Sequence, residues 1–354
     1  MDFCTYFDRN YVPRGLVLVN SILTHGDPKA RIWILALDSF TGAFLKQLSL
    51  PGVNVIGIEE LEAFFPALLA AKRNRSRLEY FWTLSPFLPY YLMYVRPRLS
   101  SVCYLDSDMA LFASPEAIWQ DLGADAAALV VPHNYSAEYA SEERSGRFNV
   151  GLMAYNAAGA RACLEWWAER CLEWCYARHE DGRFGDQAYL DEWPRRFDNI
   201  VVSTRPGLGA APWNAGKCEL GQAANGELQI AGERLVAYHF HGVRPCLGRL
   251  VQVASWPVRL SAQWIEWVYR PYAEMLLAVE RWASERGSVI RSPRAGLPVR
   301  YAIGRLVKRQ PLRHFLIARK TAVKFAGLSC GQSVPDAAEA SADKRSGERR
   351  TQAG

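Results

Sequence analysis

Two carboxylates follow an apolar segment near the middle of the first half of the chain. The segment Ser101–Leu105 (SVCYL) has the composition of a buried strand, and it leads into Asp106 and Asp108 with one serine between them. Because alternate residues of an extended segment point to the same side, both carboxylates can face one ligand. Hard oxygen donors suit Mg²⁺ or Mn²⁺ and leave coordination positions for phosphate oxygens. The alternative is a solvated turn, since Asp and Ser commonly end strands.

A second motif, Tyr238–Gly242 (YHFHG), contains two histidines separated by one residue. His239 and His241 would lie on one side of a strand end, and Gly242 would allow a ligand to approach the backbone. Three interpretations remain open. The motif could belong to a zinc site that needs a further ligand, it could hold two structural histidines, or one histidine could complete the coordination of a cation held by the two aspartates.

Further polar residues stand where a ligand could reach them. Asp186 and Gln187 follow a glycine in the segment 182–190 (GRFGDQAYL), at the start of a predicted helix. Such a position exposes backbone donors, although Asp186 could simply cap the helix. Asn149 and Gly151 in FNVG are of the kind that binds sugars by hydrogen bonds and close backbone approach.

Strands and helices are predicted to alternate along most of the chain. This order indicates an α/β fold with a mostly parallel central sheet flanked by helices, in which ligands bind at the carboxyl ends of the strands. Leu235–Phe240 is the last strand that the pattern predicts, and residues 134–147 form a loop that could close over a ligand. The predicted strands are 2–7, 31–37, 53–58, 101–105, 126–131 and 148–156, and the predicted helices are 15–24, 59–94, 163–176 and 261–286.

The charge is unevenly distributed. The formal net charge of the 354 residues is +6, but residues 1–285 carry 27 Lys and Arg against 32 Asp and Glu, whereas residues 286–325 carry 11 basic residues and no acidic one. This balance argues against a uniform nucleic-acid-binding surface, and the lack of a recognisable nucleic-acid-binding module disfavours binding through the basic tail. We expect one domain over residues 1–286, a basic and partly helical extension over 287–328 that suits an anionic membrane surface, and a disordered tail over 329–354.

The chain lacks the patterns of secreted and membrane-spanning proteins. Its eight cysteines form no C-x-x-C pair, no secretory leader is visible, and the longest apolar stretches are interrupted well short of a membrane span. We therefore expect a cytoplasmic protein, peripheral on the cytosolic face of the inner membrane if the basic extension binds lipid.

Taken in order, these motifs resemble the nucleotide-sugar glycosyltransferases of GT-A fold, in particular glycosyltransferase family 8. The resemblance covers roughly residues 2–285 and rests on the early strand, YLDSD, FNVGLMAYN, FGDQAYL and YHFHG. The sequence departs from the family at YFWTLSP, where Thr83 stands in place of an arginine that often precedes the leucine, which indicates a divergent branch.

The resemblance implies a role for each motif. Asp106, Asp108 and His239 would bind Mn²⁺ or Mg²⁺. Gly242 and Arg244 would approach the diphosphate of a nucleoside diphosphate sugar, where the family usually has a lysine. Asp186 and Gln187 would lie beside the reacting carbon. The remaining donor-binding positions would be Thr5, Tyr6, Asp8, Asn149 and Gly151.

The implied activity is a metal-dependent, retaining transfer of a hexose, most readily from a UDP-sugar, to a glycan or lipid-linked acceptor of cell-surface polysaccharide synthesis. Two alternatives remain open. One is a non-catalytic protein that binds sugar nucleotides or glycans on the same scaffold. The other is a zinc-dependent hydrolase that uses Asp106, His239 and His241.

Overall fold

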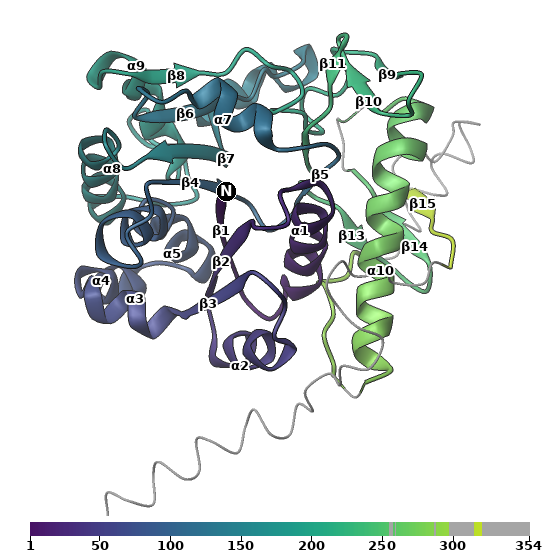
Figure 1. Cartoon of the computed structure of the whole chain (residues 1–354), viewed down its shortest axis with the longest axis horizontal. Helices are drawn as coiled ribbons and strands as arrows, with labels where there is room; N and C mark the ends of the chain where they lie inside the picture. Colours follow the sequence, from purple (N-terminus) through teal and green to yellow (C-terminus); the bar gives the residue numbers. More distant parts are fainter. Residues whose placement is uncertain (255–257, 259, 287, 297–314, 321–354) are drawn as a thin grey trace, which may run out of the picture.

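A seven-stranded sheet lies at the centre of the computed structural model, which describes residues 1–254, 258, 260–286, 288–296 and 315–320 (Figure 1). Its strand order is β3-β2-β1-β4-β7-β6-β8, and β7 runs antiparallel to both neighbours while the other pairs are parallel. The α/β fold with a mostly parallel sheet is thus confirmed. The strands are β1 (Asp2–Phe7), β2 (Arg31–Ala36), β3 (Val53–Gly57), β4 (Ser101–Leu105), β6 (Ala128–Pro132), β7 (Phe148–Asn156) and β8 (Ile200–Val202).

Helices cover both faces of this sheet because its strands carry apolar side chains on both sides. Phe3 and Cys4, successive residues of β1, belong to two different hydrophobic clusters. The cluster on the side of Phe3 includes α1 (Val12–His25), α2 (Ser39–Leu48), α7 (Glu116–Leu122) and α10 (Arg270–Ser284). The cluster on the side of Cys4 includes α3 (Ile58–Phe64), α4 (Ala67–Asn74), α5 (Arg77–Thr83), α6 (Phe87–Tyr90) and α8 (Arg161–Glu173).

Short helical segments connect several of these elements. They are the π-helices η1 (Tyr91–Val95) and η4 (Trp264–Tyr269), the 3₁₀-helices η2 (Ala137–Ser145) and η3 (Gln187–Glu192), and the single turn α9 (Trp193–Arg196). The prediction of a loop over residues 134–147 is therefore wrong for most of its length, since η2 occupies it. A 3₁₀-helix needs no apolar period, so the polar composition of this segment gave no helical signal.

Three small sheets follow or flank the main one. The first pairs β5 (Met109–Leu111) with β12 (Ala237–His239), the second contains β9 (Leu220–Gln222), β10 (Leu228–Ile230) and β11 (Glu233–Arg234), and the third contains β13 (Arg244–Pro245), β14 (Leu250–Gln252) and β15 (Phe315–Ile317). The prediction that the last strand ends at residue 240 is wrong, because β13, β14 and β15 follow it. Strands of two or three residues are too short to show alternation in a sequence.

The third sheet concerns the predicted basic extension. β15 lies within residues 287–328 and pairs antiparallel with β14, and Ala295 N donates a hydrogen bond to Pro245 O. The predicted tail, 329–354, lies outside the described residues. Within the described part of the chain, none of the helices combines the length and apolarity needed to cross a bilayer.

The topology brings distant motifs to one edge of the main sheet. β1, β4 and β6 run in the same direction, so their carboxyl ends lie at this edge, and antiparallel β7 begins there. Figure 1 shows α10 beside α1, next to this part of the molecule. Residues at the ends of β1 and β4 and at the start of β7 are therefore neighbours in space.

Candidate functional site

The two aspartates of the central motif lie directly after β4, opposite the histidine segment. β5 and β12 pair antiparallel so that His239 stands across from Met109, the residue after Asp108. Phe240 N donates a hydrogen bond of 2.9 Å to Asp108 O, and Asp106 N donates one of 2.8 Å to Gly151 O. The backbone thereby fixes three motifs that are far apart in the sequence.

A cluster of metal-binding side chains results. The ligand atoms of Asp108, His239 and His241 all lie within 4.8 Å of one another. His239 Nε2 is 3.0 Å from Asp108 Oδ1 and 3.7 Å from Asp106 Oδ2. Two imidazoles and a carboxylate, with a second carboxylate adjacent, are donors that suit Mn²⁺ or Zn²⁺, so the residues fit a divalent cation. The sequence prediction paired Asp106 and Asp108 with His239, and the structure adds His241 to that group.

Electrostatics in the cluster is dominated by close opposite charges. Burial and the charge of Asp108 raise the pKa of Asp106, although His239 opposes this effect and Tyr104, whose hydroxyl donates a 2.6 Å hydrogen bond to Asp106, does too. Burial alone would also raise the pKa of Asp108, but the charge and hydrogen bond of His239 lower it well below the ordinary value. Burial alone would lower the pKa of His239, but Asp108 and then Asp106 raise it. The site therefore holds an ionised Asp108 beside His239.

Asn149 and Gly151, at the start of β7, pack against the histidine. Asn149 Oδ1 accepts a hydrogen bond from Gly151 N at 2.5 Å, and Asn149 Nδ2 lies 3.4 Å from His239 Nδ1. A Cβ atom at residue 151 would lie 2.7 Å from His239 Nδ1, so this position requires glycine. Both residues thus fix the imidazole ring from the side away from the aspartates.

Asp186 is buried next to the same edge. Its Oδ2 accepts a 2.6 Å hydrogen bond from Ser85 Oγ, which lies 3.1 Å from the Tyr6 hydroxyl. Asp186 precedes η3 but makes no capping hydrogen bond with its side chain, so the capping interpretation is wrong. Burial raises its pKa to about 7, against the opposing hydrogen bond from Ser85. Near neutral pH this carboxyl can therefore hold or release a proton.

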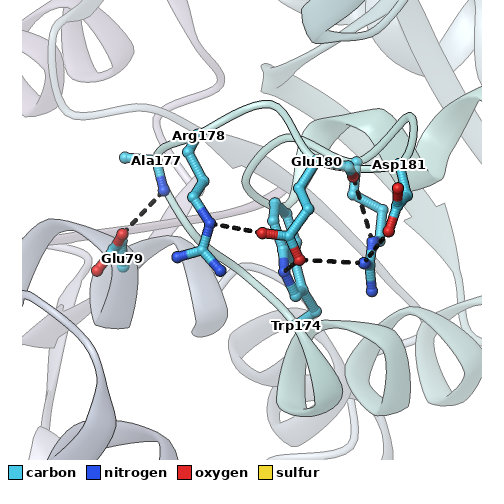
Figure 2. A network of polar contacts seen from close by, with 7 residues as sticks. Glu79, Trp174, Ala177, Arg178, Glu180 and Asp181 are labelled. Carbon is cyan, nitrogen blue, oxygen red and sulfur yellow. Dashed lines mark hydrogen bonds and ion pairs between the residues drawn. The ribbon is translucent and has the colours of Figure 1, made fainter.

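The loop before Asp186 is fixed by a polar network (Figure 2). Glu180 accepts hydrogen bonds from Trp174 Nε1 at 3.1 Å and from Arg178 Nε at 2.7 Å. Glu79 of α5 accepts a hydrogen bond from Ala177 N at 2.9 Å. Ser85 follows α5 closely in the sequence, and the loop that leads to Asp186 is hydrogen-bonded to Glu79 of α5. The positions of Ser85 and Asp186 are therefore both tied to α5.

The other predicted donor-binding residues differ in what they contact. The buried hydroxyl of Thr5 has no hydrogen-bond partner among the described residues. Asp8 accepts hydrogen bonds from the backbone of Asn10 and forms a 2.7 Å ion pair with Arg77, so its oxygens already have partners. Gln187 Nε2 donates a 2.8 Å hydrogen bond to the carbonyl of residue 145 and so connects η3 to the end of η2.

The turn after β12 presents a free cation to the same region. Gly242 has a φ of +81°, a conformation that favours glycine. Arg244 is exposed, and its guanidinium has no hydrogen bond or ion pair among the described residues. Sequence reasoning missed Arg14, in the first turn of α1, and Tyr11, the residue that precedes this helix. The segment NYVPRG carried a signal in its arginine, which directly follows a proline at the helix start. Tyr11 is 40% exposed and carries Arg14 against its ring at 4.6 Å.

The sequence is similar to two proteins of Bacillus subtilis (strain 168). No family model matches the sequence. The uncharacterized protein YfnF of Bacillus subtilis (strain 168) is 31% identical over 249 residues, which cover 68% of this chain and 81% of the relative. The chain belongs to the same family as YfnF. A second relative, the uncharacterized protein YfnD of the same organism, is 28% identical over 288 residues, which cover 80% of this chain and 90% of the relative.

Two solved structures similar to this YfnF-family chain are glycosyltransferases. The galactosyltransferase LgtC in complex with donor and acceptor sugar analogues is 16% identical with a TM-score of 0.48, over 80% of this chain and all (100%) of the other. Mouse xyloside xylosyltransferase 1 is 13% identical with a TM-score of 0.43, over 68% of this chain and 98% of the other.

Proposed function

We propose that this protein is a metal-dependent glycosyltransferase that moves a sugar from a nucleoside diphosphate sugar, most readily a UDP-sugar, to a glycan or lipid-linked acceptor. The observation that carries the proposal is the cluster of Asp108, His239 and His241 beside Asp106, at the sheet edge where the exposed Arg244 also lies. A cation site next to a free arginine is what a diphosphate needs.

The residues of the site divide the work of such a transfer. A divalent cation bound by Asp108, His239 and the neighbouring donors would offset negative charge on the departing diphosphate. Arg244 would bind the outer phosphate oxygens, and the glycine before it would let them approach the backbone. The unpartnered Thr5 hydroxyl would donate to the nucleoside, and the exposed ring of Tyr11 could stack on the base.

Asp186 and Gln187 would act at the sugar. Asp186 lies in a buried hydrogen-bonded chain with Ser85 and Tyr6, and Gln187 is held by the end of η2. Together they would orient the sugar and stabilise the positive charge that develops at its reacting carbon. Retention of configuration and transfer of a hexose belong to this proposal through the family resemblance alone.

Donor binding gives the direct test. In a thermal-shift series with UDP, GDP, ADP and their sugar conjugates, one nucleoside should stabilise the protein in the presence of Mn²⁺ and much less in its absence. D108A should lose this stabilisation and at least about 100-fold of transfer activity, because a ligand and a buried charge partner of His239 both disappear. D125A, which removes an exposed carboxylate, is the matched control and should behave like the unaltered protein.

The results also separate the alternatives. Metal-dependent binding of nucleotide with no turnover of any sugar conjugate would identify a non-catalytic binding protein. The presence of two histidines in the cluster favours, as a second candidate, a zinc-dependent hydrolase that uses Asp108, His239 and His241. Stoichiometric zinc retained through purification, without any nucleotide effect, would establish that candidate and exclude the transferase.

The place of action is part of the proposal. The basic segment 286–325 would hold the protein against an anionic lipid surface on the cytosolic side of the membrane, near a lipid-linked acceptor for cell-surface polysaccharide. The exposed side chains of Arg249, Arg319 and Lys320, close to β14 and β15, support this orientation.

A further inference from the structure

Arg14 is a buried arginine without a carboxylate partner. It is 3% exposed, and its hydrogen bond among the described residues goes to a backbone carbonyl. One terminal nitrogen, NH2, donates a 2.7 Å hydrogen bond to Val243 O, while the other, NH1, is buried with no partner among those residues. Burying a guanidinium with one of its terminal nitrogens lacking a hydrogen-bond partner lowers the stability of the folded protein. A functional role for Arg14 would explain why the protein keeps it there.

Its place on the helix adds to this cost. Arg14 lies in the first turn of α1, which begins at Val12 and has Pro13 as its second residue. The N-terminal end of a helix already carries partial positive charge. A cation here is unfavourable unless an anion lies close by. Within the described residues, the charge of Arg14 acts on Asp108: burial raises the pKa of Asp108, whereas His239, His241 and, to a smaller extent, Arg14 lower it.

Arg14 also joins two sides of the site that are 229 residues apart in the sequence. On one side its guanidinium lies 4.6 Å from the ring of Tyr11, at the end of the β1 region. On the other it holds the carbonyl of Val243, between Gly242 and Arg244. The side chain therefore lies against the Tyr11 ring and is hydrogen-bonded to the turn that carries Arg244, and the hydrogen bond is the contact that can fix that turn.

Charge arithmetic favours an anion as the missing partner. With a divalent cation bound, the two aspartates would be neutralised, and Arg14 and Arg244 would then remain as two uncompensated positive charges at this edge. A nucleoside diphosphate carries a matching negative charge on adjacent phosphates. A neutral sugar or nucleoside would leave both cations without a counter-charge.

We propose that Arg14 is a positioning residue of the diphosphate site: it fixes the Gly242–Arg244 turn through the Val243 carbonyl and supplies a permanent positive charge behind that turn. This inference rests on the proposed function, because it assigns Arg14 to the diphosphate of the same ligand. It predicts that Arg14 affects the affinity for phosphates and leaves the affinity for the metal unchanged.

The experiment compares R14M, R14K and the unaltered protein, with R270M as the control. Arg270 is also a partly buried arginine, but it lies on α10 and pairs with Glu266. Dissociation constants for UDP and for uridine are measured by calorimetry with saturating Mn²⁺, and the Mn²⁺ affinity is measured separately by electron paramagnetic resonance. R14M should weaken UDP binding by roughly 10- to 100-fold, and uridine and Mn²⁺ binding should change by less than about threefold.

R14K separates charge from general structure. Lysine keeps the positive charge but lacks the planar, bidentate donor geometry of arginine. We therefore expect R14K to lose less UDP affinity than R14M and more than R270M, which should lose none. Should R14M fail to fold, R14K alone tests the inference by its ratio of UDP to uridine affinity, which should fall. R270M should lose stability without changing either affinity.

The outcomes distinguish the two levels of the argument. If the unaltered protein binds no nucleoside diphosphate in the presence of Mn²⁺, the proposed function is wrong and the inference falls with it. If it binds UDP, and a folded R14M or R14K binds UDP equally well, the inference about Arg14 is wrong while the proposed function stands. Equal losses for UDP and uridine would show a purely structural role and would also overturn it.

Discussion

Asp186 provides a prediction whose size follows from its burial. Its ordinary pKa of 3.8 is raised to about 7 in the folded protein, chiefly by burial, with 6% of the residue exposed. The folded state therefore holds the proton more tightly than the unfolded state does. The stabilisation from this proton is complete below pH 3.8 and is lost as the pH rises through about 7. A shift of roughly three pH units at 1.36 kcal/mol each corresponds to about 4 kcal/mol.

The perturbation that reveals this effect is D186N. Asparagine has nearly the same shape, its oxygen can still accept the hydrogen bond from Ser85, and it does not ionise in this range. The free energy of unfolding is measured by urea denaturation for both proteins between about pH 4 and pH 8. Relative to the unaltered protein, D186N should gain up to about 4 kcal/mol across this interval, with most of the change between pH 4 and pH 7.

A matched control keeps this result specific. D125N removes an exposed carboxylate, so its difference from the unaltered protein should stay nearly constant with pH. If the curves for D186N and the unaltered protein run parallel over the whole interval, Asp186 is not protonated in the folded state near neutral pH. The reasoning from burial would then be refuted, because water or a cation must be reaching this carboxylate.

Two further predictions concern the histidine and the basic segment. In G151A the new Cβ would lie 2.7 Å from His239 Nδ1, so the ring must move, and Mn²⁺ affinity measured by electron paramagnetic resonance should fall by about tenfold or more. The control is G42A, whose Cβ would lie at an ordinary 3.6 Å from its neighbour and which should keep the Mn²⁺ affinity of the unaltered protein. The full-length protein should sediment with phosphatidylglycerol vesicles at low salt and be released at high salt. Equal sedimentation with neutral phosphatidylcholine vesicles would contradict an electrostatic attachment.

The longer strands and helices, and their alternating order, could be predicted from the sequence. Strands such as β1, β4 and β7 are long enough to show their apolar composition, and the alternation with helices fixes a mostly parallel sheet. Because parallel strands end at one edge, the order of elements predicted that a ligand would bind there; the pairing of β4 with β1, which brings Asp106 beside β1, is known from the structure. The small sheets were missed because two or three residues carry no readable period.

Side-chain relationships were predictable only where the backbone dictates them. The two aspartates lie on one strand end, and the sequence identified them. His241 was identified as a metal ligand only in the hydrolase alternative, because its distance from Asp108 depends on the pairing of β5 with β12. The segment around Arg14 carried only a local signal, and its role could not be predicted, since the contact that defines it joins α1 to a carbonyl 229 residues away.

The distribution of charge now has a physical explanation within the site. The body of the chain, residues 1–285, has more acidic than basic residues, so its overall field does not attract a diphosphate from a distance. Under the proposed function, recognition of such an anion would arise at short range, from the cation that Asp108 and His239 would hold and from the arginines at 14 and 244. Arg244 is exposed and available to the ligand, whereas Arg14 is buried and permanently oriented. An exposed arginine that would contact the diphosphate, supported by a buried one behind the turn, would favour the bound anion with little reorganisation of charge on binding.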